Sequence, residues 1–68
     1  MEQLVYLSLL FDFYGALLTD KQKESLLLHL FEDFSLAEVG DALGISRQSV
    51  YDNIRRAELS MKDYEKKL

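Results

Sequence analysis

Residues 35–56, SLAEVGDALGISRQSVYDNIRR, decide the fold of this 68-residue chain, because they contain the signals for two short helices joined by one tight turn. Ser35 followed three residues later by Glu38 is a capping box, which predicts that a helix begins there. Gly44 is expected to end that helix, since the residue past a helix end often needs a positive φ that glycine adopts without strain. Ser46 is then placed to cap a second helix. This arrangement predicts a helix-turn-helix.

The apolar positions of this stretch predict how the two helices pack. Apolar side chains of the first helix recur at spacings of three and four, and Gly40 leaves a bare patch that a second backbone can approach. In the second helix Val50 and Ile54 are expected to face inward. A helical hairpin that binds no nucleic acid shares much of this pattern. Gly40, Gly44 and the inward Val50 favour the nucleic-acid-binding motif.

The outward face of the second helix carries mixed donors and acceptors of the kind that read base edges. Its predicted members are Arg47, Gln48, Ser49, Tyr51, Asp52, Arg55 and Arg56. The chain as a whole has a net charge of −4, which disfavours nucleic-acid binding, although the arginines against Asp52 leave this helix positive. So few cations predict weak, salt-sensitive binding unless two copies act together.

Length and composition predict one small all-α domain spanning residues 1–68. The chain is 49% hydrophobic, with no proline and three glycines, so it has few breaks. Helices are expected near 2–17, 20–33, 36–43 and 47–66, with the helix-turn-helix at 35–56 and a helical tail at 57–68. A domain of this size is marginal alone, which makes help from a partner chain plausible.

The N-terminal helix is apolar around most of its circumference. Two neighbouring seams repeat at three and four residues, and one partner surface cannot cover both. A homodimer contact is favoured, while packing within a single compact domain is the alternative. The residues expected at the dimer interface are Leu4, Leu7, Phe11, Tyr14, Met61 and Tyr64.

The helix at 20–33 begins with a second capping box, Thr19 with Gln22. Its predicted inner face consists of Leu27, Leu30, Phe31 and Phe34, with Leu26 in support, whereas Leu28 falls away from that face. Lys21 and Lys23 are expected in water.

The last helix continues a heptad seam through Val50, Ile54, Ala57, Met61, Tyr64 and Leu68. The later positions need a surface to lie against, either the N-terminal helix of the same chain or a second subunit; mixed charges disfavour a membrane surface. The seam is still running at Leu68, which makes the C-terminus look truncated.

Several function classes are disfavoured. No phosphate-binding glycine loop, nucleophile–base pair or histidine cluster is present, so we expect no enzyme, no cofactor and no small-molecule substrate. The lone His29 is better explained by a hydrogen bond to Glu32 or Asp33 than by a metal. Without cysteines, a signal peptide or a bilayer-spanning apolar run, we expect a cytoplasmic protein with no membrane insertion.

Three stretches carry a family resemblance: LFDFYGALLTDKQ at 10–22, FEDFSLAEVGDALGISRQSVYDNIRRAE at 31–58, and MKDYEKKL at 61–68. The chain resembles the YlxM-like helix-turn-helix proteins of bacteria, whose genes are associated with those of the signal recognition particle, and it is similar to region 4 of sigma factors. The resemblance implies a sigma-region-4-like fold, dimerisation and a regulatory part in the signal recognition particle pathway. Family members usually extend further as a helical tail. The recognition-helix role would fall on Ser46, Arg47, Gln48, Ser49, Tyr51, Asp52, Asn53, Arg55 and Arg56.

The sequence thus predicts a non-enzymatic regulator that binds nucleic acid, DNA in preference to RNA, as a homodimer. The alternative is a protein-interaction module of the same fold that regulates a signal recognition particle GTPase or another partner without binding nucleic acid.

Overall fold

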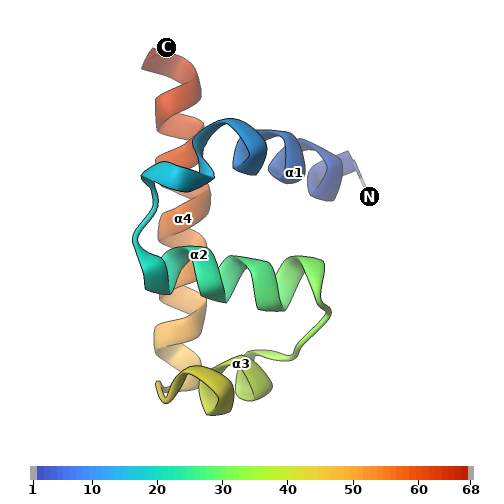
Figure 1. Cartoon of the computed structure of the whole chain (residues 1–68), viewed down its shortest axis with the longest axis vertical. Helices are drawn as coiled ribbons and strands as arrows, with labels where there is room; N and C mark the ends of the chain where they lie inside the picture. The colour runs from blue at the N-terminus through green and yellow to red at the C-terminus, as the bar shows by residue number, and fades with distance from the viewer. Residues whose placement is uncertain (1, 68) are drawn as a thin grey trace.

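The computed structural model describes the backbone of residues 2–67 and the side chains of residues 4–67, and this part of the chain is all-α (Figure 1). The elements in chain order are α1 (Glu2–Tyr14), the 3₁₀ turn η1 (Gly15–Leu17), α2 (Asp20–Leu26), the π-helical turn η2 (Leu27–Phe31), α3 (Leu36–Leu43) and α4 (Arg47–Lys67). The predicted all-α domain with four helices is therefore confirmed.

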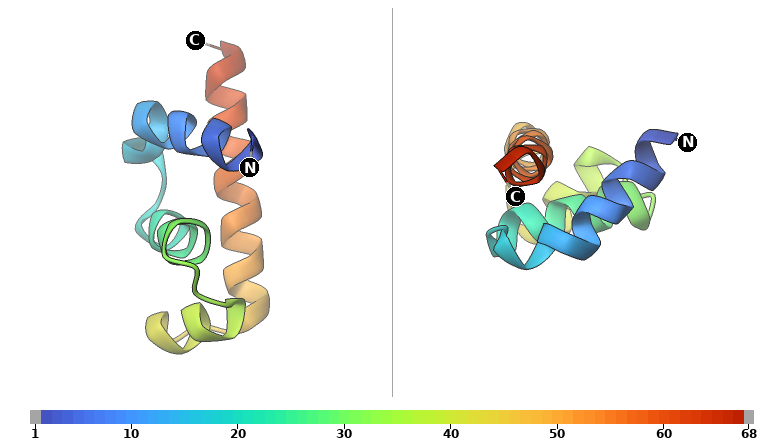
Figure 2. Two further views of the ribbon diagram at one scale, coloured as in Figure 1. Left: turned by 90° about the vertical axis from the view of Figure 1, so that its right-hand side faces the viewer. Right: turned by 90° about the horizontal axis from the view of Figure 1, so that it is seen from above.

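The long helix α4 is the column against which the other helices pack. Figures 1 and 2 show α1, α2 and α3 stacked along one side of it, with α1 near its C-terminal end and α3 at its N-terminal end. The 21 residues of α4 bury Val50, Ile54, Ala57 and Met61, which recur at spacings of four and three. Among the described residues, no helix combines the length and apolar character needed to cross a membrane.

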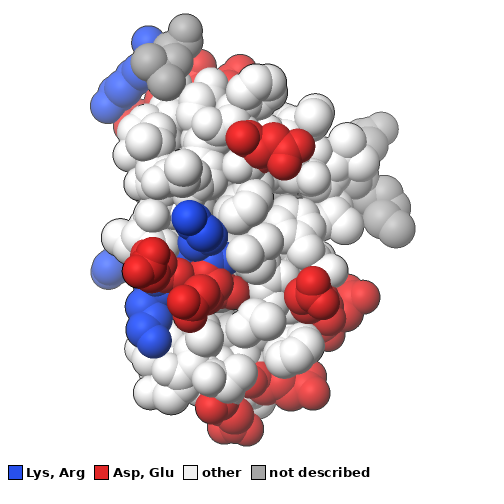
Figure 3. Space-filling view, viewed as in Figure 1, with Lys and Arg blue, Asp and Glu red and all other residues white. Residues whose placement is uncertain are grey.

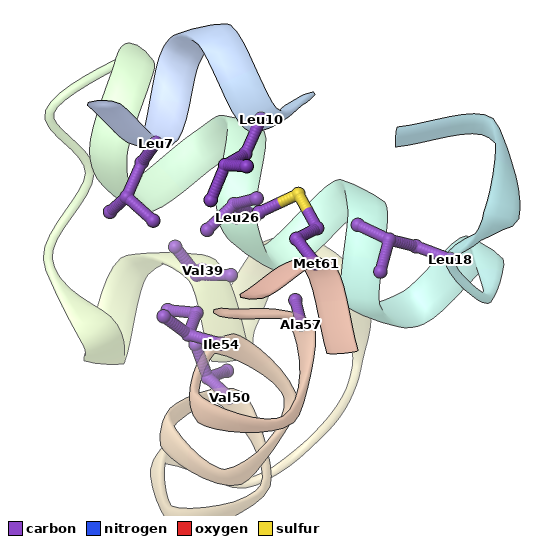
Figure 4. Close-up of a cluster of buried hydrophobic side chains, with 9 residues drawn as sticks. All are labelled: Leu7, Leu10, Leu18, Leu26, Val39, Val50, Ile54, Ala57 and Met61. Atoms are coloured by element: carbon purple, nitrogen blue, oxygen red, sulfur yellow. The ribbon is translucent and has the colours of Figure 1, made fainter. Parts of the chain in front are cut away.

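One hydrophobic core joins all four α-helices (Figure 4). Its buried members are Leu7, Leu10, Leu18, Leu26, Val39, Val50, Ile54, Ala57 and Met61. The heptad seam of α4 therefore lies against its own chain, the first of the two surfaces expected for it. Tyr64 continues the seam half-buried, with its ring centroid 6.0 Å from that of Tyr14, while Leu68 lies outside the described residues.

Both predicted capping boxes are present. The Thr19 hydroxyl accepts from the Gln22 amide at 3.2 Å, and the Gln22 side chain accepts from the Thr19 amide. Ser35 and Glu38 make the same pair of bonds at 3.1 and 2.9 Å. These bonds satisfy amide groups that the first helical turn leaves unpaired, and they set the starts of α2 and α3.

The predicted inner face of the second helix was wrong in part. Leu26 is fully buried, whereas Phe34 is 37% exposed because the chain leaves the helix after Phe31 and turns at Asp33, where φ is +59°. Leu28, expected to face away, packs against the core. Leu28 belongs to η2, and this turn is covered on a second side because α3 packs against it.

Helix α1 buries one side and leaves the other open. Leu7 and Leu10 are buried, but Phe13 is 76% exposed and Val5 is 61% exposed. Of the residues expected at a dimer interface, Leu7 and Met61 lie in the core of their own chain, so they offer no surface to a second copy.

The other four interface candidates keep some exposed surface. Leu4 is 37% exposed, while Phe11, Tyr14 and Tyr64 are half-buried.

Candidate nucleic-acid interface

The turn between α3 and α4 holds the two helices at close range. Gly44 ends α3 with φ at +70°, and the amide of Ile45 donates to the carbonyl of Gly40 at 3.0 Å. A Cβ on Gly40 would lie 2.7 Å from the carbonyl oxygen of Ile45, closer than real Cβ atoms approach. Gly40 is therefore needed for the close approach that the sequence predicted, and Gly44 for the backbone conformation of the turn.

Ser46 begins α4 at this turn. Its hydroxyl accepts from the Ser49 amide at 3.1 Å and donates to the Ser49 hydroxyl at 2.9 Å. Both hydroxyls therefore take part in capping the start of α4. The next residues, Arg47 and Gln48, are exposed at the N-terminal end of this helix.

The nine predicted recognition residues all lie in the first three turns of α4 or at its cap. Eight are exposed, and Asn53 is half-buried at the edge of the face. Among the described side chains, residues 4–67, Arg47, Arg55 and Arg56 have no ion-pair partner; the ion pair found there joins Lys67 to Asp63. The guanidinium groups are accordingly available to an anionic ligand.

A hydrogen bond joins the side chain of Gln48 to that of Asp52, one helical turn further along α4. The Gln48 Nε2 donates to Asp52 Oδ1 at 3.1 Å. Both side chains are exposed, on the side of α4 opposite the buried Val50 and Ile54. Asp52 therefore engages Gln48 and leaves Arg56, four residues further along the helix, unpaired within the described chain.

A shallow groove of about 550 Å³ lies between the start of α3 and the first turn of α4. Its lining residues are Ser35, Leu36, Ala37, Arg47, Gln48 and Tyr51. The three residues at the start of α3 were absent from the predicted site, although the capping box at Ser35 marks this helix start in the sequence. Accepting the Ser35 amide lowers the pKa of the Glu38 carboxyl at the same helix start, so this carboxyl stays ionised.

Lys21 is exposed, as expected, and its Nζ also donates to the carbonyl oxygen of Leu43 at 3.3 Å. That carbonyl lies at the C-terminal end of α3, where unpaired carbonyl groups favour a cation. Lys21 thereby links α2 to the last turn of α3 and helps to hold the motif in place.

The predicted hydrogen bond of His29 to Glu32 or Asp33 was wrong. The His29 Nδ1 lies 2.7 Å from the carbonyl oxygen of Phe34, to which it donates a hydrogen bond because a carbonyl oxygen can only accept. The side chain thus fastens the loop that leads into α3. Over the described residues, no three histidine, cysteine or acidic side chains group together as metal ligands.

Charge is unevenly spread over the surface. Figure 3 shows acidic side chains over α3 and the loop before it, and a mostly uncharged area over α1. Three arginines stand within ten residues at the start of α4. The N-terminal half of α4 therefore carries a local excess of positive charge, with three arginines against Asp52.

Comparisons with known proteins also point to a helix-turn-helix protein. All 68 residues match the family described as "Putative helix-turn-helix protein, YlxM / p13 like", UPF0122. A UPF0122 protein of Thermoanaerobacter sp. (strain X514) is 49% identical over 98% of this chain and 57% of its own length. One from Lacticaseibacillus casei (strain BL23) is 58% identical over 87% of this chain and 52% of its own length. One from Streptococcus gordonii is 56% identical over 87% of this chain and 54% of its own length.

The chain spans about half the length of these curated relatives. The match nevertheless covers every described helix and the whole helix-turn-helix. The chain belongs to the UPF0122 family of helix-turn-helix proteins like YlxM and p13.

Proposed function

We propose that this protein is a non-enzymatic regulator that binds duplex DNA through the first three turns of α4. The observation that carries the proposal is the exposed polar face between Arg47 and Arg56, which stands beside α3 across a tight glycine turn. Helix-turn-helix proteins place such a helix in the major groove, where its N-terminal residues meet base edges. Duplex DNA is favoured over RNA because the major groove of A-form RNA is too narrow for a helix to read.

The face divides into two parts along the helix. Arg47 and Gln48 stand at its start, beside the groove against α3, in the position of base-reading residues. Arg55 and Arg56 lie two turns further on, without an ion-pair partner among the side chains that the structure describes, and are suited to phosphate groups. In this arrangement the first pair supplies sequence preference and the second pair supplies affinity.

A second copy of the chain is the proposed partner in this function. The open side of α1 has a groove of about 310 Å³ lined by Leu4, Val5, Ser8, Leu9 and Phe31. The exposed Phe13 lies one turn beyond Leu9, and the exposed Leu17 follows in η1; both can fill apolar grooves on a symmetry-related copy.

Two copies would present two sets of α4 arginines to one duplex and so double the number of phosphate contacts, although each copy also brings its own net charge of −4. Dimeric helix-turn-helix proteins bind paired half-sites about one DNA turn apart.

The decisive experiment measures binding of the purified 68-residue chain to a pool of random DNA duplexes at ~50 mM and ~200 mM salt, with the mass of the complex determined in parallel. We expect salt-sensitive enrichment of a subset of duplexes by a dimer. A matched pool of RNA duplexes tests the preference for DNA. Absence of binding to either pool at the lower salt concentration contradicts the proposal.

The acidic net charge favours a second candidate, in which the same fold is a protein-interaction module. In that case the open side of α1 contacts a signal recognition particle GTPase, in keeping with the pathway that the family resemblance implies. Purified chain and purified GTPase would be mixed and their complex measured by calorimetry. A complex that forms while DNA binding is negligible at ~50 mM salt favours this candidate; no complex contradicts it.

A further inference from the structure

We propose that Gln48 reads an adenine in the major groove and that Asp52 is the positioning residue that makes it reject guanine. This inference rests on the proposed DNA-binding function and adds the base that one residue recognises. The feature behind it is the hydrogen bond of 3.1 Å from Gln48 Nε2 to Asp52 Oδ1 on the exposed side of α4.

The chemistry of the pair fixes the orientation of the Gln48 amide. A carboxylate can only accept hydrogen bonds, so the side of the amide that faces Asp52 must be its NH₂ group. One of the two N–H groups is used in this bond. The second N–H and the carbonyl oxygen remain for an outside ligand, as a donor next to an acceptor.

That remaining pattern matches one purine. Adenine presents an acceptor at N7 and a donor at N6 in the major groove, and a glutamine amide pairs with both at once. Guanine presents two acceptors, N7 and O6, and an unrestrained glutamine can meet them with its two N–H groups. Because one N–H donates to Asp52, Gln48 cannot use both N–H groups to bind guanine. An acceptor of guanine then faces the carbonyl oxygen of Gln48, and the two oxygen or nitrogen acceptors repel each other.

The same role for Asp52 accounts for the presence of an acidic residue on the proposed DNA-facing surface. A carboxylate there weakens attraction to phosphates for every sequence alike. Its contribution in this proposal is to specificity, since rejecting the wrong base is an independent route to specificity. The contact with Gln48, and the absence of an Asp52–Arg56 ion pair among the described residues, are consistent with this use.

The test compares base preferences of four proteins on a pool of duplexes randomised over the central positions: the parent chain and three variants. The variants are Gln48→Ala, Asp52→Ala and Asp63→Ala. Asp63 is a matched control: it is a carboxylate of the same helix that pairs with Lys67 at 3.0 Å, far from Gln48. Gln48, Asp52 and Asp63 are exposed, so each variant is expected to keep the thermal unfolding midpoint of the parent chain.

We expect the parent chain to prefer adenine over guanine at one position by about 5-fold to 150-fold, the range typical of one bidentate contact. Gln48→Ala should remove the preference at that position alone. Asp52→Ala should admit guanine there while binding random duplexes more tightly. Asp63→Ala should tighten random binding without changing the adenine-to-guanine ratio.

Two results would overturn the inference while leaving DNA binding intact. One is an adenine preference that survives Gln48→Ala. The other is an Asp52→Ala protein whose adenine-to-guanine ratio equals that of Asp63→Ala. Failure of the parent chain to bind any duplex at ~50 mM salt has a separate meaning, since it overturns the proposed function and this inference together.

Discussion

The Tyr14 hydroxyl donates a hydrogen bond of 2.7 Å to Glu65 Oε2, joining the end of α1 to the last turns of α4 across 51 positions of sequence. The Tyr14 ring also packs against Tyr64, with centroids 6.0 Å apart. The hydrogen bond, together with desolvation and the negative charge of Glu65, raises the pKa of Tyr14 above its ordinary value. This contact holds in place the helix whose other side is the proposed dimer surface.

Replacing Tyr14 with phenylalanine should loosen α1 while leaving the ring contact with Tyr64. We expect a small decrease in the thermal unfolding midpoint and faster amide hydrogen exchange confined to α1, because the contact is local and partly exposed. The raised pKa means that the parent chain keeps this advantage below pH ~10 and loses it as the phenol ionises above that value. Tyr51→Phe, which removes an exposed hydroxyl elsewhere, is the control; equal exchange rates in both variants would contradict the role of Tyr14.

Substitution of Gly40 by alanine should disrupt the turn of the motif. The new Cβ would meet the backbone oxygen of Ile45 at 2.7 Å, and neither atom can move without shifting α3 against α4. We expect a decrease of about 1–3 kcal/mol in the free energy of unfolding, measured by urea denaturation, and weaker DNA binding. Gly44→Ala is the comparison: nothing lies within 4 Å of its Cβ, so only the positive φ penalises it, by about 1 kcal/mol. Near-parent stability of Gly40→Ala would show that the helices do not need this close approach.

The features that the sequence predicted well are encoded by near neighbours. The capping boxes at Thr19 and Ser35 and the positive φ of Gly44 depend on residues within a few positions, so their signals are readable without a fold. The inward spacing of Val50 and Ile54 likewise follows from helical periodicity alone. These signals were enough to predict the helix-turn-helix.

The features that the sequence did not predict depend on contacts between distant elements. The burial of Leu28 requires α3 to fold back against η2, and the bond from Lys21 to Leu43 joins two helices 22 positions apart. The bond of His29 goes to the loop beyond its own helix rather than to Glu32 or Asp33 on the next turn. Periodicity within one helix carries no information about these partners.

Replacing Arg55 and Arg56 together by alanine should weaken binding to every duplex by a similar factor. The two guanidinium groups have no ion-pair partner among the described residues and are assigned to phosphates. We expect the slope of log affinity against log salt concentration to become shallower by about one for each phosphate that an arginine no longer neutralises, with base preferences unchanged. Lys66 and Lys67, replaced in the same way, make the same change of charge at the far end of α4. If both double variants bind equally weakly, the arginines act only through net charge.

An aspartate at Phe13 should separate the proposed dimer without unfolding the chain. Phe13 is 76% exposed, so a charge there is tolerated by the isolated fold but not in an apolar interface. Sedimentation equilibrium should give the mass of one chain for Phe13→Asp and of two chains for the parent. Leu59→Asp makes the same kind of change on an exposed leucine of α4 outside the proposed interface and should remain dimeric. A parent chain that sediments as a monomer would rule out the dimer.

Replacement of Glu38 by glutamine should change how the stability of α3 depends on pH. Because Glu38 accepts from the Ser35 amide, its pKa in the folded chain lies below the ordinary value, so its charged form stabilises the fold above about pH 4.5. That contribution disappears as the pH falls through the lowered pKa, whereas glutamine keeps a neutral acceptor at every pH. We therefore expect Glu38→Gln to be less stable than the parent at pH 7 and the difference to shrink steadily toward pH 3 in paired thermal unfolding measurements. Glu24→Gln, which replaces an exposed carboxylate of α2 with no hydrogen bond among the described residues, provides the baseline, and a pH-independent difference for Glu38→Gln would show that its charge does not contribute to the cap.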